Sequence, residues 1–149
     1  MKEIIIEENE GPSFVYERTA NYYETDQMGI IHHSNYIRWF EEARLSCLKQ
    51  MGLSYESMEE RGIMIPVLSV SCQYKSAVRY DDKIVIYVSI TQFNGVKMKV
   101  AYEVRDAESG ELRTTGESEH GFLDKNFRPL RLKRDFSDIF ETLKQNTVL

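Results

Sequence analysis

The chain has 149 residues, of which 42% are hydrophobic and 29% are charged, and its formal net charge is −5 at pH 7. This length and composition predict one domain over residues 1–149 and exclude a disordered chain or a membrane protein, because no apolar run approaches the ~20 residues of a spanning helix. The acidic balance argues against general nucleic-acid binding. No signal peptide is recognisable at the N-terminus, so we expect a cytoplasmic protein.

The first predicted strand covers residues 13–23, which are rich in aromatic and β-branched side chains. A polar loop over 24–33 follows and leads directly into the strongest helical pattern of the chain. A helix N-terminus presents unpaired N–H groups and the positive end of the helix dipole. A carboxylate just ahead of it is therefore well placed for acyl or phosphoryl chemistry, and the candidate is Asp26.

The helix begins at Ser34 or Asn35, either of which is an acceptable N-cap, and apolar residues recur at steps of three and four as far as Met51. Gly52 is placed to end it. Its apolar residues extend beyond one face, so we expect a helix that other elements cover on several sides. A second, shorter helix is predicted over residues 54–61.

The second half of the chain is predicted to form strands at 67–80, 83–93, 96–106 and 111–124. Asn94-Gly95 is a strong hairpin signal, so the last three strands form an antiparallel meander. The strand that begins at Val96 alternates, with apolar residues on one face and charged residues such as Glu103 and Arg105 on the other. A short amphipathic helix from Asp135 ends the chain. The sequence therefore predicts an α+β fold, with an antiparallel sheet curled around a helix.

Two further features concern binding chemistry. Residues 125–134 contain five basic and no acidic residues, whereas the rest of the chain has 14 basic and 24 acidic ones. A local basic patch on an acidic protein favours a polyanionic small molecule, and a solvated basic tail is the alternative. Cys47 and Cys72 lie within apolar patterns and are predicted to be buried thiols, without a disulfide or a zinc site.

A continuous motif joins the end of the first strand, the loop and the long helix. It reads YETDQMGIIHHSNY from Tyr23 to Tyr36 and continues as RWFEEAR over 38–44. This string resembles the motif of the 4-hydroxybenzoyl-CoA thioesterase family of hotdog-fold acyl-CoA thioesterases. The resemblance extends from about residue 14 to residue 132 and includes RYDD at 79–82 and RPLR at 128–131.

The resemblance implies a hotdog fold, with an antiparallel sheet wrapped around a long central helix, in homodimers that often form homotetramers, and an active site at the subunit interface. Asp26 matches the catalytic acid of the family. His33 matches the position whose backbone N–H polarises the thioester carbonyl. The implied substrate-binding residues are Tyr23, Gly29, Ile31, Asn35, Tyr36, Arg128 and Arg131, the two arginines through the phosphates of coenzyme A.

The chemistry needs an attacking water or carboxylate and a donor for the developing oxyanion. Asp26 could act as a general base or as a nucleophile, and the His33 side chain could orient substrate or hydrogen-bond to Asp26. Glu41 and Glu42 are competing acids on the helix, although solvated glutamates are the better interpretation. No metal site and no cofactor are expected. A carrier-protein thioesterase and a non-catalytic acyl-CoA-binding module remain alternatives.

Overall fold

The computed structural model describes residues 13–148 and contains one five-stranded antiparallel sheet. Its strands are β1 (Phe14–Thr19), β2 (Val67–Tyr74), β3 (Lys83–Phe93), β4 (Lys97–Asp106) and β5 (Leu112–Gly121), in the spatial order β1-β3-β4-β5-β2. The predicted meander of the last three strands is confirmed. The N-terminal segment, for which no signal peptide is predicted, lies outside the described residues, and one domain over residues 1–149 stays a prediction.

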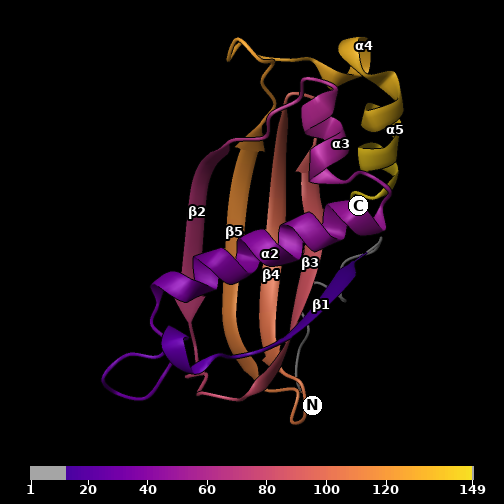
Figure 1. Cartoon of the computed structure of the whole chain (residues 1–149). Coiled ribbons are helices and arrows are strands. Elements are labelled where there is room, and N and C mark those ends of the chain that lie inside the picture. The colour runs from indigo at the N-terminus through magenta and orange to yellow at the C-terminus, as the bar shows by residue number, and fades with distance from the viewer. Residues whose placement is uncertain (1–12, 149) are drawn as a thin grey trace.

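Helices lie across the sheet and at one end of it. They are the 3-10 turn η1 (Tyr22–Glu24), α2 (Ser34–Gln50), α3 (Tyr55–Glu60), α4 (Leu132–Asp135) and α5 (Ser137–Gln145). Figure 1 shows α2 crossing one face of the sheet, with α3, α4 and α5 gathered at the end opposite to the start of α2. The predicted end of α2 at Gly52 is confirmed, since this glycine follows the helix with φ +85°, whereas the helix begins at Ser34 with His33, not Ser34 or Asn35, at the N-cap position. Within residues 13–148, no helix has the length and apolarity needed to cross a bilayer.

The core lies between α2 and the sheet. Trp39, Phe40 and Tyr102 are almost fully buried there, and the rings of Phe40 and Tyr102 stack with centroids 4.4 Å apart. Gly116 of β5 makes room for this contact, since a Cβ at that position would stand 2.3 Å from Phe40 Cε2. A glycine in this strand therefore allows α2 to approach the sheet closely.

Several predicted strands are too long at their ends. The strand predicted over 67–80 ends at Tyr74, because the N–H groups of Lys75 and Ser76 both donate to the carbonyl of Arg113 and the chain leaves the ladder. The first strand likewise ends at Thr19, and η1 follows it. The predicted C-terminal helix from Asp135 is divided into α4 and α5.

The predicted alternation along β4 is only partly correct. Val96 was expected on the dry face but is 41% exposed, because the Asn94 side chain accepts the N–H of Val96 and holds it in the hairpin turn. Glu103 and Arg105 were expected on the wet face but are buried. Their ion pair, at 2.8 Å between Arg105 Nε and Glu103 Oε1, makes that burial tolerable for both charges.

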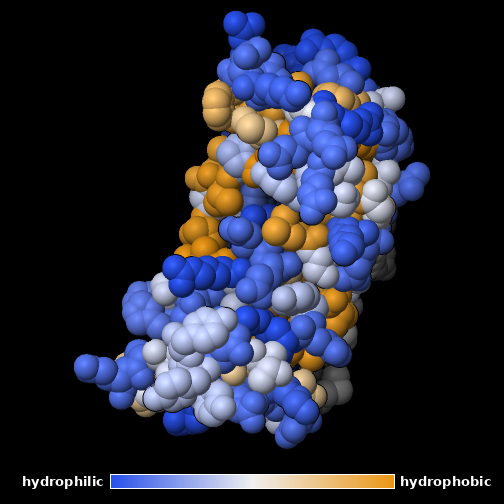
Figure 2. Space-filling model, viewed as in Figure 1, coloured by the Kyte–Doolittle hydropathy of each residue, from blue (hydrophilic) through white to orange (hydrophobic). Residues whose placement is uncertain are grey.

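The edge strand β2 leaves apolar side chains in contact with solvent. Val67, Leu68, Val70 and Tyr74 are 38–51% exposed, although all belong to β2, whose ladder with β5 shifts register between Val67 and Ser69. In Figure 2, hydrophobic atoms gather along the side of the molecule where Figure 1 places β2. An edge strand that is both apolar and unpaired on one side is a typical surface for pairing with another chain.

Candidate functional site

The loop between η1 and α2 is folded as a small turn around Asp26. An isolated bridge joins Thr25 to Ile31, and the N–H of Asp26 donates to the Ile30 carbonyl at 2.8 Å. Gly29 closes the turn at φ +78°, a conformation that side-chain-bearing residues rarely adopt. Asp26 Oδ1 accepts the Met28 N–H at 2.8 Å, so the backbone itself orients the carboxylate.

The first turn of α2 presents a free donor next to this loop. His33 already has helical dihedral angles, φ −54° and ψ −30°. The N–H of Ser34 donates to Nδ1 of the adjacent His32 at 3.2 Å, so this donor of the first turn is already paired. No hydrogen bond among the described residues uses the His33 N–H. The helix N-terminus therefore offers a donor to an incoming acceptor.

Asp26 and His33 line one pocket of about 300 Å³. Its remaining walls are apolar and aromatic residues of the loop and α2, together with the end of β2 and the segment after it, and they comprise Met28, Ile30, Ile31, Tyr36, Tyr74, Lys75, Ser76 and Ala77. The rings of Tyr36 and Tyr74 meet edge to face, with centroids 5.3 Å apart. Burial raises the pKa of Tyr36, so its hydroxyl stays protonated near neutral pH.

The structure brings some of the predicted site residues together. Asp26, Ile31, His33 and Tyr36 share the pocket, as the resemblance implies. The Asp26 carboxylate accepts its hydrogen bond from Met28, within its own turn, and the His33 ring instead stacks on the His32 ring, with centroids 4.2 Å apart. The turn at Gly29 shapes the loop from outside the pocket.

Tyr23 and Asn35 lie on the other side of the loop. They line a second cavity of about 400 Å³. The Asn35 side chain is buried and donates to the Glu24 carbonyl at 2.9 Å, so its visible role is to hold the loop. Within one chain, these two residues do not share the pocket of Asp26.

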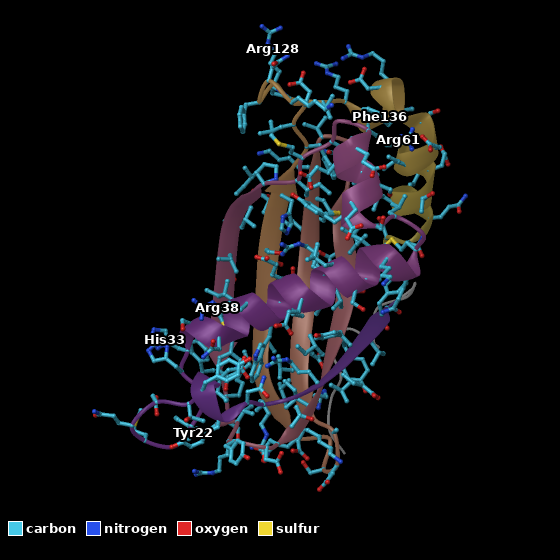
Figure 3. All side chains as sticks on the ribbon, in the orientation of Figure 1. Tyr22, His33, Arg38, Arg61, Arg128 and Phe136 are labelled. Carbon is cyan, nitrogen blue, oxygen red and sulfur yellow. The ribbon has the colours of Figure 1, made fainter. Side chains whose placement is uncertain are left out.

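Arg128 and Arg131 stand far from this pocket in the same chain. Figure 3 shows Arg128 at one end of the molecule and His33 at the other. Arg131 directly precedes α4, which lies at the same end as Arg128. A single chain therefore does not bring the predicted phosphate-binding arginines to the candidate carboxylate.

Sequence reasoning missed the part of the pocket that follows β2. Tyr74, Lys75 and Ser76 come from a segment about forty residues beyond the loop, and the alternating pattern there predicted only a longer strand. No motif marks these residues, because the break in the ladder that turns them toward the loop depends on tertiary hydrogen bonds.

Comparison with known families decides what this fold is. The sequence profile of the thioesterase-like superfamily matches residues 21–141, which include the whole loop, α2 and all of the sheet except β1. The chain belongs to this superfamily. In Bacillus subtilis, the superfamily relative named "Putative acyl-CoA thioesterase YneP" is 35% identical over 123 residues, covering 82% of this chain and 88% of that protein.

Solved structures agree with this assignment. A DHNA-CoA thioesterase from Staphylococcus aureus superposes with a TM-score of 0.85 at 36% identity, covering 89% of each chain. Among sequence relatives, a 1,4-dihydroxy-2-naphthoyl-CoA hydrolase of Synechocystis is 25% identical over 109 residues, covering 72% of this chain and 79% of that protein. This member of the superfamily thus has the hotdog thioesterase fold, of class α+β.

Proposed function

We propose that this protein is an acyl-CoA thioesterase that hydrolyses its substrate to a free acid and coenzyme A in the pocket of Asp26 and His33. It is a thioester hydrolase by family, and its relatives are named for acyl-CoA substrates. One observation carries the proposed site: the pocket is lined both by the carboxylate residue Asp26 and by His33, whose N–H is used by no hydrogen bond within residues 13–148. These are the two groups that acyl transfer requires.

The proposed chemistry assigns one role to each group. The thioester carbonyl oxygen accepts the His33 N–H, which polarises the carbonyl and then holds the oxyanion of the tetrahedral intermediate. Asp26 either takes a proton from the attacking water or adds to the carbonyl carbon itself, giving an anhydride that water then hydrolyses. In both routes the carbon–sulfur bond breaks and the coenzyme A thiolate leaves and takes up a proton.

We further propose that the protein belongs to the 4-hydroxybenzoyl-CoA thioesterase family in particular and that it acts in the cytoplasm. The acyl group would contact the apolar and aromatic walls formed by Ile31, Tyr36 and Tyr74. Lys75 contributes a cation among the residues that line the same pocket. Arg128 and Arg131 would bind the phosphates of coenzyme A, since guanidinium groups pair well with phosphate oxygens.

We also propose that the protein acts as a homodimer, or as a homotetramer of such dimers, and that β2 is the pairing edge. Antiparallel pairing of two β2 strands puts Val67 of one copy opposite Tyr74 of the other. Met64, just before β2, bridges to Leu123, so the hairpin that carries Arg128 extends beyond that end of β2. The pairing thereby moves Arg128 of each copy toward the pocket of the other, which accounts for its distance from the site within one chain.

The test is a panel of acyl-CoA thioesters and matched acyl-carrier-protein thioesters, assayed with wild type and Asp26→Asn. Because a positioned base contributes about 100-fold or more, Asp26→Asn should lower kcat by at least that factor. Asp106→Asn is the matched control, since Asp106 holds a turn in the same way, accepting the Ser109 N–H at 2.7 Å. If no thioester is hydrolysed, or if Asp26→Asn is as active as wild type, the proposal is lost.

A further inference from the structure

Glu24 is a buried carboxylate at the base of the Asp26 loop. Only 5% of its surface is exposed, although charged side chains are rarely buried unless they are fully paired. The Arg18 Nη1 lies 2.9 and 3.0 Å from its two oxygens, and the Trp39 indole N–H donates to Oε2 at 2.8 Å. The backbone N–H of Asn21 donates to Oε1 at 2.9 Å. The carboxylate thus joins β1, η1 and α2.

The backbone of the same residue closes the loop. The Glu24 carbonyl accepts the N–H of His32 at 2.8 Å and the side-chain amide of Asn35 at 2.9 Å. These bonds connect Glu24, the last residue before the loop, to His32 near the end of the loop and to Asn35 in the first turn of α2. Asp26 lies two positions after Glu24, and His33 directly follows His32, so both proposed reacting groups lie within two residues of this junction.

Arg18 has a second carboxylate partner, so Glu24 is not needed merely to neutralise its charge. Arg18 Nε also pairs with Glu42 at 3.0 Å, and Glu42 accepts the Tyr16 hydroxyl at 2.9 Å. Burial alone would raise the pKa of Glu24, but the donors from Asn21, Arg18 and Trp39 outweigh it and the pKa is lowered. The carboxylate therefore keeps its charge and all its donors at neutral pH.

From these contacts we infer that Glu24 is a positioning residue for thioester hydrolysis: it locks the loop to α2 so that the Asp26 carboxylate and the His33 N–H face one reacting carbonyl. This inference rests on the proposed function. A small displacement of reacting groups is enough to slow a reaction strongly. The charge, the length and the three donor partners of the Glu24 side chain all contribute to this placement of Asp26 and His33.

The experiment compares Glu24→Gln with Tyr16→Phe in the full chain. Glutamine keeps the shape but turns an amide N–H₂ toward Arg18 or Trp39, whereas Tyr16→Phe removes one hydrogen bond from the outer end of the same network. Glu24→Gln should lower kcat by about tenfold or more with KM changed by less than about threefold, because the aromatic walls Tyr36 and Tyr74 and the segment after β2 lie outside the loosened loop. Tyr16→Phe should stay within about twofold of wild type on both constants.

Amide hydrogen exchange gives a readout that does not depend on activity. Residues 25–33 should exchange about tenfold faster in Glu24→Gln than in wild type, and unchanged in Tyr16→Phe. Trp39 is the only tryptophan, so its fluorescence reports the same contact directly. If Glu24→Gln folds poorly, Trp39→Phe is the second variant, since it removes one donor to Glu24 and keeps an aromatic ring.

The outcomes separate the two claims. Faster loop exchange together with a lower kcat supports the inference. A lower melting temperature with unchanged kcat per folded molecule and unchanged exchange in 25–33 makes Glu24 a stabilising ion pair only and overturns it. If wild type hydrolyses no thioester, the proposed function fails, and unchanged exchange in both variants would then overturn the anchoring role as well.

Discussion

His120 of β5 is fully buried, with its Nε2 2.7 Å from Ser118 Oγ and that hydroxyl 2.6 Å from the hydroxyl of Tyr102. Burial, and after it the positive charge of Arg44, lowers the pKa of His120 to about 4. The folded protein therefore holds a neutral imidazole in its core at neutral pH. An unfolded chain has no such constraint and takes up the proton at a higher pH.

This difference predicts how stability depends on pH. As the pH falls from 6.5, the unfolded state binds a proton on His120 that the folded state refuses until about pH 4. The contribution is complete above about pH 7.5 and should be lost progressively, by about 2.5 kcal/mol by pH ~4.5. Urea unfolding at a series of pH values measures it. His120→Gln should flatten the slope in this window, and an unchanged slope would contradict the assignment to His120.

The carboxylates with lowered pKa values act in a different window. Glu24 is the buried example, and it loses its stabilising contacts only when protonated, at a pH below its ordinary value of 4.5. The histidine effect can therefore be read between about pH 6.5 and 4.5, above the range in which Glu24 is protonated.

At the scale of elements, the contact of α2 with β5 depends on one missing side chain. Gly116 has no φ that only glycine can adopt, so its role is space: a Cβ would stand 2.3 Å from Phe40 Cε2 and 3.0 Å from the Ser71 carbonyl oxygen. Phe40 cannot move away freely because its other face stacks on Tyr102. The helix and the sheet are thus held at a separation that one methyl group would change.

Gly116→Ala should consequently destabilise the fold by about 1–3 kcal/mol through overpacking. Gly121→Ala is the matched control on the same strand, because the nearest atom to its Cβ, Leu68 Cδ1, is at an ordinary 3.6 Å. We expect that control to change the free energy of unfolding by less than about 0.5 kcal/mol. Equal effects of the two substitutions, measured by chemical unfolding, would show that Gly116 is not a packing constraint.

The sequence predicts elements well where a pattern is local and poorly where a distant segment decides. The steps of three and four in 34–51 and the glycine after them define α2 correctly. The ends of β2 and the burial of Glu103 and Arg105 depend on partners in other strands, which periodicity does not contain. For the same reason, Asp26 and His33 could be named from a motif, whereas Lys75 and Ser76 could not.

At the scale of the whole molecule, the two parts of the proposed site lie at opposite ends of the sheet along the strand direction. The pocket lies at the end where α2 begins, and the hairpin with Arg128 lies at the other (Figure 3). The exposed edge strand β2 runs between them. Its apolar, unpaired side is what makes a second copy the proposed means of joining the two parts.

Val70→Asp should therefore yield a monomer, because it places an unpaired carboxylate near the middle of the paired β2 strands, and burying such a charge costs several kcal/mol. The monomer should also lose thioesterase activity, since the partner's Arg128 no longer reaches the pocket. Val96→Asp is the control, as Val96 is 41% exposed and Val70 is 38% exposed. Sedimentation analysis measures the mass, and an active Val70→Asp dimer would exclude β2 as the interface.

The turn around Asp26 has a consequence for how such enzymes diversify. The carboxylate is oriented by the main-chain N–H of Met28, and the turn is closed by other main-chain bonds, so the side chains of Gln27 and Met28 are not needed for its placement. Met28 is 73% exposed and nevertheless lines the pocket. If the proposed function holds, a mutational library at Met28 should therefore alter which acyl groups are accepted while leaving the Asp26 carboxylate where it is.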